Sequence, residues 1–195
     1  MEIVYPEGAT PLDPDEINGL RIQSVTTRDD LDRWEQINIL EAINWVETGR
    51  IGDILTEEFV RKLHLKMFGN VWKWAGKYRK SEKNIGVFWE RIPEEIAKLL
   101  GDARFWIDER SMPADETGAM FHYRLELIHP FPNGNGRHGR LMTDLLMNRI
   151  LGAERFSWGG NRLSRDSDVR KRYIDALRAV DQSNDYGPLI EFVRS

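Results

Sequence analysis

The chain carries a helix-breaking segment, Pro130 to Gly136, between two runs of helical spacing. Before the break, Phe121, Leu125 and Ile128 recur at intervals of four and three residues, which places them on one face of a helix. After the break, a second apolar stripe begins at Leu141. The segment between them holds two prolines and two glycines, which interrupt helices. The pattern predicts two long helices joined by one short loop.

The rest of the chain is also predicted to be helical. Capping hydroxyls followed by acids mark two helix starts, at Thr27 and Thr56, and glycines mark their ends. Pro93, with acids behind it, starts another helix. We expect helices over about 27–48, 56–68, 93–108, 115–129, 135–150, 167–181 and 188–194.

Three further expectations concern the first half of the chain. Residues 1–25 are predicted to form an irregular arm. The helix over 27–48 carries an apolar stripe expected to face the core, made of Leu31, Trp34, Ile37, Leu40 and Ile43. Only the stretch 85–88 resembles a strand, and with a turn over 81–84 it would form one short hairpin. The predicted fold class is all-α with at most one β-hairpin.

Composition excludes several classes of protein. The 195 residues contain no cysteine, so disulfides, thiolate metal ligands and a cysteine nucleophile are excluded. The N-terminus lacks the basic and apolar regions of a secretory signal, and no stretch has the roughly 18 apolar residues that a membrane-spanning helix needs. We therefore expect a soluble cytoplasmic protein without membrane contact.

Charge is unevenly distributed along the chain. The net charge of -4 argues against general binding to nucleic acid. Residues 1–56 hold 12 acids against 4 arginines, a balance of 4 - 12 = -8. Residues 137–178 hold 10 basic residues against 5 acids, a balance of 10 - 5 = +5. Such a distribution arises from ordinary solvated surfaces or from a basic anion site faced by an acidic N-terminal segment.

The helix predicted to begin near Asn135 breaks the usual rules for a helix start. Its first turn carries Arg137 and Arg140 instead of acids, although the free N–H groups there favour negative charge. Gly134 and Gly136 flank the start at an entropic cost. A bound phosphate would resolve both conflicts, because it accepts hydrogen bonds from bare N–H groups and pairs with guanidinium groups.

One histidine lies next to this proposed anion site. His129 precedes the loop, and its ordinary pKa of about 6.5 would allow it to accept a proton from a hydroxyl. His64, His122 and His138 are interpreted as structural, and a zinc site built from histidines 122, 129 and 138 lacks compact spacing. Phe131 is expected to anchor the loop to the core.

The run HPFPNGNGRHGR, His129 to Arg140, resembles the signature of the Fic family, His-any-Phe-any-Asp/Glu-Gly-Asn-Gly-Arg-any-any-Arg. The resemblance extends over about residues 50–195, through 74–79 upstream and 188–190 downstream. More narrowly, the chain is similar to small bacterial Fic proteins called mobile mystery protein B, which are often encoded beside a helix-turn-helix protein. The resemblance implies a Fic-type helical bundle with a hairpin flap near the active site. It also divides the chain into an N-terminal arm and helix over 1–49, a candidate regulatory segment, and a Fic domain over 50–195.

The resemblance implies transfer of AMP from ATP to a Ser, Thr or Tyr hydroxyl of a target protein. His129 would be the general base, and Gly134, Asn135 and Gly136 would hold the α-phosphate, with the Asn side chain taking part. Arg137 and Arg140 would grip the outer phosphates. The flap that aligns the target would comprise Ser81, Glu82, Lys83, Asn84, Ile85, Gly86 and Val87.

Two positions depart from the family pattern. Asn133 stands where the family usually has the acid that ligates Mg²⁺, so weaker metal binding and slower or altered transfer are expected. Many Fic proteins also carry an inhibitory glutamate that pairs with the second arginine of the signature. Glu35 is the nearest candidate for this role, with Arg140 as its partner, but Leu31 and Gln36 do not match the flanking pattern.

Two alternatives remain open at this point. The same site would serve transfer of a phosphoryl or another phosphate-bearing group, or the protein would be an impaired Fic scaffold that binds a nucleotide or a partner without turnover. Asn133 favours the binding module, whereas the intact His129 favours an enzyme. The chain has no GxxxxGK motif, which argues against a P-loop NTPase.

Overall fold

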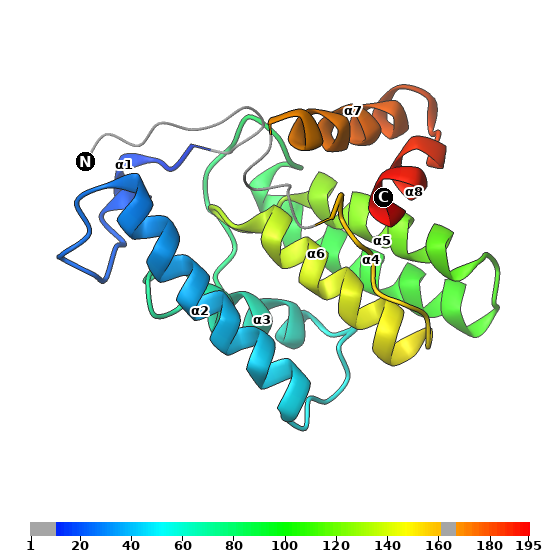
Figure 1. Ribbon diagram of the computed structural model, residues 1–195, viewed down its shortest axis with the longest axis horizontal. Coiled ribbons are helices and arrows are strands. Elements are labelled where there is room, and N and C mark those ends of the chain that lie inside the picture. The colour runs from blue at the N-terminus through cyan, green and yellow to red at the C-terminus, as the bar shows by residue number, and fades with distance from the viewer. Residues whose placement is uncertain (1–10, 161–166) are drawn as a thin grey trace.

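The computed structural model describes residues 11–160 and 167–195, and this part of the chain is built from helices (Figure 1). It contains no strand; the only strand-like feature in these ranges is an isolated antiparallel bridge between Leu20 and Trp72. The elements are α1 (Pro14–Ile17), α2 (Arg28–Thr48), α3 (Glu57–Phe68), the 3₁₀ turn η1 (Trp89–Arg91), α4 (Ile92–Asp108), α5 (Ala114–Ile128), α6 (Asn135–Leu145), the π-helical turn η2 (Leu146–Ile150), α7 (Ser167–Ser183) and α8 (Gly187–Arg194). The all-α prediction is confirmed.

The helix starts predicted from capping residues are also confirmed. The Thr27 hydroxyl accepts a hydrogen bond from the N–H of Asp30 at 3.1 Å, and α2 ends at Gly49. The hydroxyl of Thr56 accepts from the N–H of Phe59 at 3.1 Å in the same way. Such caps satisfy N–H groups that have no partner inside the helix.

The N-terminal arm has more structure than its sequence predicted. Residues 14–17 form the short helix α1, which begins at a proline. The chain then runs beside the segment after α3, where Arg21 N donates to Val71 O and Lys73 N donates to Gly19 O, both at 2.8 Å. These backbone bonds hold the arm against the Trp-rich segment.

Helix α6 lies in the middle of the molecule, with α2 and α3 on one side and α5, α7 and α8 on the other (Figure 1). The larger apolar core is built from residues of α2, α3, α4, α5 and α6 and of the segments between them. A smaller one joins α7 and α8 to α5 and to the segment after α6. Among the described helices, none combines the length and apolar character needed to cross a lipid bilayer.

The apolar stripe predicted for α2 is wrong in part. Trp34, Ile37 and Leu40 are 43%, 49% and 55% exposed, and Ile43 is only partly buried. The buried face consists of Leu31, Glu35, Asn38, Ile39, Ala42 and Val46. The helix is rotated so that two polar side chains enter the interior, where they find hydrogen-bond partners.

Candidate active site

The loop between α5 and α6 is closed by the side chain of Asn135. Its amide oxygen accepts from Phe131 N at 2.9 Å, and its amide nitrogen donates to Phe131 O at 2.8 Å. Phe131 is fully buried and stacks on His64 with ring centroids 3.7 Å apart, so the predicted anchor is confirmed. The amide of Asn135 therefore shapes the loop, whereas the sequence had suggested that it would contact phosphate.

Gly134 caps the start of α6 in a conformation that favours glycine. Its φ is +79°, and a Cβ at this position would lie 2.6 Å from an atom of the Phe68 ring. Helix α6 then begins with the N–H groups of Asn135, Gly136 and Arg137, which have no acceptor inside the helix. Their partial positive charge faces the loop that precedes the helix, as an anion site requires.

Arg137 is held by Glu35 from α2. The two side chains form an ion pair at 2.6 Å, and the guanidinium lies 4.8 Å from the ring centroid of Phe68. The other carboxylate oxygen of Glu35 accepts from the indole N–H of Trp72 at 2.6 Å, and Glu35 is 3% exposed. The expectation that Glu35 would pair with Arg140 is corrected: its partner is Arg137, because Arg140 is bonded to Tyr173 instead.

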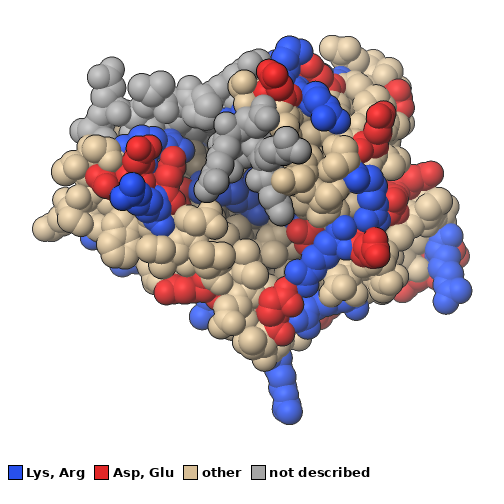
Figure 2. All heavy atoms as spheres, in the orientation of Figure 1, with Lys and Arg blue, Asp and Glu red and all other residues tan. Residues whose placement is uncertain are grey.

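Arg140 has a different partner from that of Arg137. It is hydrogen-bonded to the side chain of Tyr173 from α7. Its guanidinium also approaches the first turn of its own helix, where a Cβ on Gly136 would lie 3.3 Å from Nη1. The two arginines therefore flank the start of α6 from two sides, and Figure 2 shows basic side chains gathered in a hollow near this end of the helix.

His129 ends α5 in a left-handed conformation, with φ 51° and ψ 61°. The side chain is 5% exposed. Burial, and after it the nearby charges of Arg79 and Lys83, lower the pKa of His129 to about 4. A ring with this pKa is neutral at pH 7, as a proton acceptor must be.

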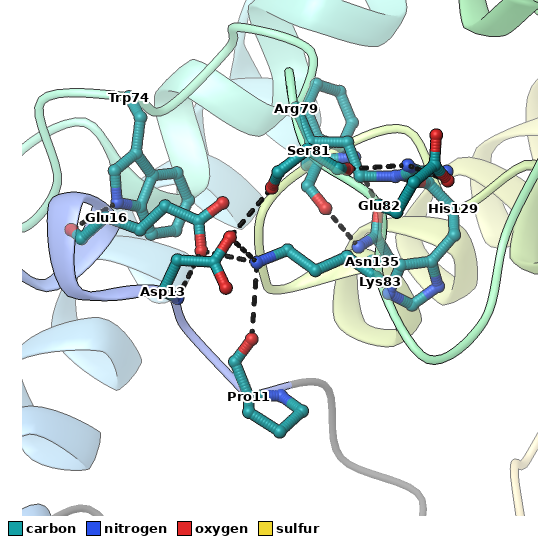
Figure 3. A network of polar contacts seen from close by, with 11 residues as sticks. Pro11, Asp13, Glu16, Trp74, Arg79, Ser81, Glu82, Lys83, His129 and Asn135 are labelled. Carbon is teal, nitrogen blue, oxygen red and sulfur yellow. Dashed lines mark hydrogen bonds and ion pairs between the residues drawn. The ribbon is translucent and has the colours of Figure 1, made fainter. Parts of the chain in front are cut away.

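Arg79 ties His129 to the segment 81–87. Its guanidinium donates to the carbonyls of His129 at 2.7 Å, of Ser81 at 2.9 Å and of Val87. The side chain is fully buried, and Figure 3 shows it between Ser81 and His129. A Cβ on Gly86 would lie 2.5 Å from this guanidinium.

The predicted hairpin at 81–87 is wrong, because this segment is an irregular loop without paired strands. The carbonyls of Ser81 and Val87 accept hydrogen bonds from Arg79 instead of from a neighbouring strand. One buried guanidinium thus replaces the ladder of bonds that a hairpin would have supplied. We keep the name flap for residues 81–87.

The remaining histidines have the environments expected of structural residues. His64 accepts from Gly76 N through Nδ1 and donates to Asn133 O through Nε2, both at 3.0 Å. His138 donates to Val60 O at 2.9 Å, and His122 is 2.8 Å from the hydroxyl of Tyr173. All three rings are fully buried.

The residues present do not fit a protein-held magnesium ion. The side-chain oxygen of Asn133 accepts from Gly134 N at 2.7 Å, so it is used within the loop. An amide oxygen also lacks the charge with which carboxylates attract Mg²⁺. The described residues hold no cluster of three or more His, Asp or Glu side chains arranged for a metal.

Sequence reasoning included Arg79 and Tyr173 in the stretch that resembles Fic proteins but gave neither a role, and it missed a set of contacts between α1 and the flap. The excess of acids in residues 1–56 was a signal for these contacts, because Asp13 and Glu16 both reach Lys83. Arg79 gave no comparable signal, since its partners lie on segments about 50 residues apart in the chain.

The comparisons with known proteins agree on one family. A model described as the Fic/DOC family matches residues 54–147. The protein adenylyltransferase fic-1 of Caenorhabditis briggsae is 38% identical over 94 residues, which are 46% of this chain and 18% of that protein. The protein adenylyltransferase Fic of Nematostella vectensis is 30% identical over 127 residues, 62% of this chain and 29% of that protein. The chain thus spans less than a third of the length of these curated relatives.

A solved structure shows the same fold. The N-terminal Fic domain of a Bep effector protein from Bartonella quintana, with bound ADP, superposes with a TM-score of 0.70 at 18% identity. The match covers 92% of this chain and 94% of that one. Residues 54–147, which contain the loop, the start of α6 and the neutral histidine described above, therefore belong to the Fic/DOC family.

Proposed function

We propose that this chain is a protein adenylyltransferase, which transfers AMP from ATP to a hydroxyl side chain of a target protein. The observation that carries the proposal is the buried, neutral His129 beside the uncapped start of α6. The names of the relatives and the ADP bound to the Bartonella domain support a nucleotide as the ligand. Because the chain spans only part of the length of those relatives, the proposal depends on the geometry of this chain.

In the proposed reaction, His129 takes the proton of the target hydroxyl as its oxygen attacks the α-phosphorus of ATP. A new bond forms between this oxygen and the α-phosphorus, and the bond from the α-phosphorus to the bridging oxygen breaks, so pyrophosphate leaves. The N–H groups of Gly136 and Arg137 at the helix start stabilise the charge on the α-phosphate. The Arg137 and Arg140 guanidiniums bind the leaving phosphates.

The ion pair between Glu35 and Arg137 makes this arrangement a resting state of the proposed enzyme. Arg137 cannot pair fully with a phosphate while a buried carboxylate 2.6 Å away neutralises it. We infer that ATP and Glu35 compete for Arg137, and that α2 is in this way an inhibitory element.

We propose that any magnesium ion enters with the phosphates of the nucleotide. Asn133 contributes no charge, and its oxygen is already used by Gly134 N. An N133D variant is expected to reach half-maximal transfer at a several-fold lower magnesium concentration, because a carboxylate attracts Mg²⁺ better than an amide does. An unchanged magnesium requirement would show that position 133 does not approach the ion.

The proposed function is tested with labelled ATP. Wild-type protein and His129→Ala are incubated with a bacterial lysate and ATP labelled at the α-phosphate or at the γ-phosphate. We expect wild type to leave the α-label, but not the γ-label, on protein, and His129→Ala to leave neither. Transfer of the γ-label would identify a phosphoryl transferase, and ATP binding without transfer of either label would identify a binding module.

A further inference from the structure

Lys83 on the flap is surrounded by oxygens from the N-terminal arm. Its ammonium lies 2.9 Å from Oδ2 of Asp13, 2.6 Å from Oε2 of Glu16 and 3.4 Å from the carbonyl of Pro11. The side chain is only 2% exposed, so these oxygens replace nearly all of its water. Figure 3 shows Lys83 reaching out from the flap to the two carboxylates.

Ser81 completes the binding of one of these carboxylates. Its hydroxyl donates to Oδ2 of Asp13 at 2.7 Å, the same oxygen that Lys83 contacts. The hydrogen bond from Lys83 and, to a smaller extent, the one from Ser81 hold the pKa of Asp13 below its ordinary value. The carboxylate is therefore ionised at neutral pH. An ammonium and a hydroxyl that converge on one oxygen are the donors expected of a carboxylate-binding subsite.

This subsite lies beside the general base. Arg79 binds the carbonyls of both Ser81 and His129, so the subsite and the base are held by one buried side chain. The charge of Lys83 is also close enough to lower the pKa of His129. A carboxylate bound at Lys83 therefore sits next to the place where a target hydroxyl must arrive.

The carboxylates that occupy the subsite belong to an element that can be displaced. Helix α1 has four residues and buries none of them. The Asp13 side chain remains 47% exposed although it pairs with Lys83. Polar contacts, such as the one from the indole N–H of Trp74 to Glu16 O at 3.0 Å, attach α1 to the rest of the protein.

We propose that Lys83 and Ser81 form a carboxylate-binding subsite that selects protein targets with an acidic residue near the modified hydroxyl, and that Asp13 and Glu16 occupy this subsite until such a target displaces them. The inference rests on the proposed transferase function and names its substrate class. The tethered carboxylates compete at the high effective concentration of an intramolecular ligand, which excludes segments without an acid.

The test uses pairs of hydroxyl-bearing peptides that differ only by Glu or Gln at one position flanking the acceptor. Binding of fluorescent peptides is measured by anisotropy, and transfer of AMP is measured by mass spectrometry, on the full chain. The variants are D13N/E16Q and K83Q. The matched controls are D15N, an exposed acid on the same helix, and K80Q, an exposed lysine next to the flap.

We expect D13N/E16Q to bind and modify Glu peptides about tenfold better than wild type does, with little change for Gln peptides. K83Q should abolish the preference for Glu, and D15N and K80Q should behave as wild type. Equal binding of Glu and Gln peptides by D13N/E16Q would overturn the subsite, even if transfer occurs. A binding preference for Glu without any transfer would support the subsite and count against the transferase proposal.

Discussion

Glu35 is one carboxylate that serves two partners. It accepts from the indole of Trp72 and pairs with Arg137, both at 2.6 Å, across segments that are distant in the sequence. The bond to Trp72 helps to hold α2 in place, and the pair with Arg137 neutralises one charge of the anion site. A substitution that keeps the first contact and removes the negative charge can therefore separate inhibition from packing.

We expect Glu35→Gln to raise ATP affinity about tenfold, or roughly 1.4 kcal/mol, because Arg137 is then available to the phosphates. The Gln oxygen can still accept from Trp72, so the fold should be retained. Isothermal titration with ATP measures the effect, and Asp29→Asn, an exposed acid in the first turn of the same helix, is the control for charge. Equal ATP affinity in wild type and Glu35→Gln would remove Glu35 from any inhibitory role.

Arg79 supplies both geometry and charge to His129. Replacement by Gln removes a cation that lowers the pKa of His129, so this pKa should rise from about 4 part of the way toward 6.5. Since only the neutral ring accepts a proton, the acidic limb of the kcat/KM profile should move to higher pH. Arg79→Lys keeps the charge and should leave the limb nearly in place while lowering kcat.

The shift is measured by NMR titration of the His129 ring, with folding checked by circular dichroism. Lys83→Gln removes the weaker of the two cationic influences and should shift the pKa in the same direction, by less. A His129 pKa that is the same in Arg79→Gln and Arg79→Lys would show that the charge of Arg79 does not act on the ring.

At the scale of single residues, the sequence predicted those that conflict with local preferences. Arginines at a helix start and glycines beside it are unfavourable unless a ligand compensates, and this conflict identified residues 134–140. Residues such as Arg79 and Lys83 could not be found in this way, because each is ordinary in its local context and acquires its role from partners far along the chain.

At the scale of elements, helix bounds were predictable and helix faces were less so. Caps depend on neighbouring residues, so the ends of α2 and α3 followed directly from the sequence. The buried face of α2 includes the polar side chains of Glu35 and Asn38. Their burial is favourable only because Glu35 binds Arg137 and Trp72, and Asn38 donates to the backbone carbonyl of Lys66. The hairpin form predicted for the flap was wrong for the same reason, since the side chain of Arg79 rather than a strand binds its backbone.

The start of α6 requires glycine at position 134 for two separable reasons. Gly134→Ala must adopt a φ near +79° and must also displace the ring of Phe68, which lies 2.6 Å from the added Cβ. We expect a loss of stability of about 2–4 kcal/mol and weaker ATP binding, measured by urea unfolding and by titration.

Two glycines provide matched controls for this prediction. Gly152 has a φ of +62° but nothing within 4 Å of an added Cβ, so Gly152→Ala should cost only the strain, about 1–2 kcal/mol. Gly101 lies inside α4 with open space around it, so Gly101→Ala should stabilise the protein by about 0.5–1 kcal/mol. If Gly134→Ala cost no more than Gly152→Ala, the contact with Phe68 would be irrelevant to the loop.

At the scale of the whole molecule, the four histidines of the chain link folding to pH. All are buried, and burial is the largest cause that lowers each pKa: well below the ordinary value for His64, to about 3 for His122, and to about 4 for His129 and His138. In the unfolded chain each would titrate near 6.5. Below pH 6.5 the histidines therefore bind more protons in the unfolded state than in the folded state. Their contribution lowers the free energy of unfolding as the pH falls.

Two buried carboxyl groups act in the opposite direction. Burial raises the pKa of Glu126 to about 7 and that of Asp144 to about 6, so both are largely protonated in the folded protein at pH 5 and ionised in the unfolded chain. They favour the folded state as pH falls through these values. Near pH 5 the histidines bind about four more protons in the unfolded state, and the two carboxyl groups bind about two more in the folded state. The unfolded state therefore binds about two protons more than the folded state.

The free energy of unfolding should therefore fall by roughly 3 kcal/mol per pH unit near pH 5, since each proton contributes about 1.4 kcal/mol per unit. Urea unfolding at intervals between pH 7 and pH 5 measures this slope. His138→Gln removes one of the four titrating rings while offering an amide donor to Val60 O, so its slope should be shallower by about one proton. Stability that stayed constant or rose as the pH fell from 7 to 5 would mean that the histidines take up protons in the folded state, and the neutral His129 on which the proposed proton transfer depends would be lost with them.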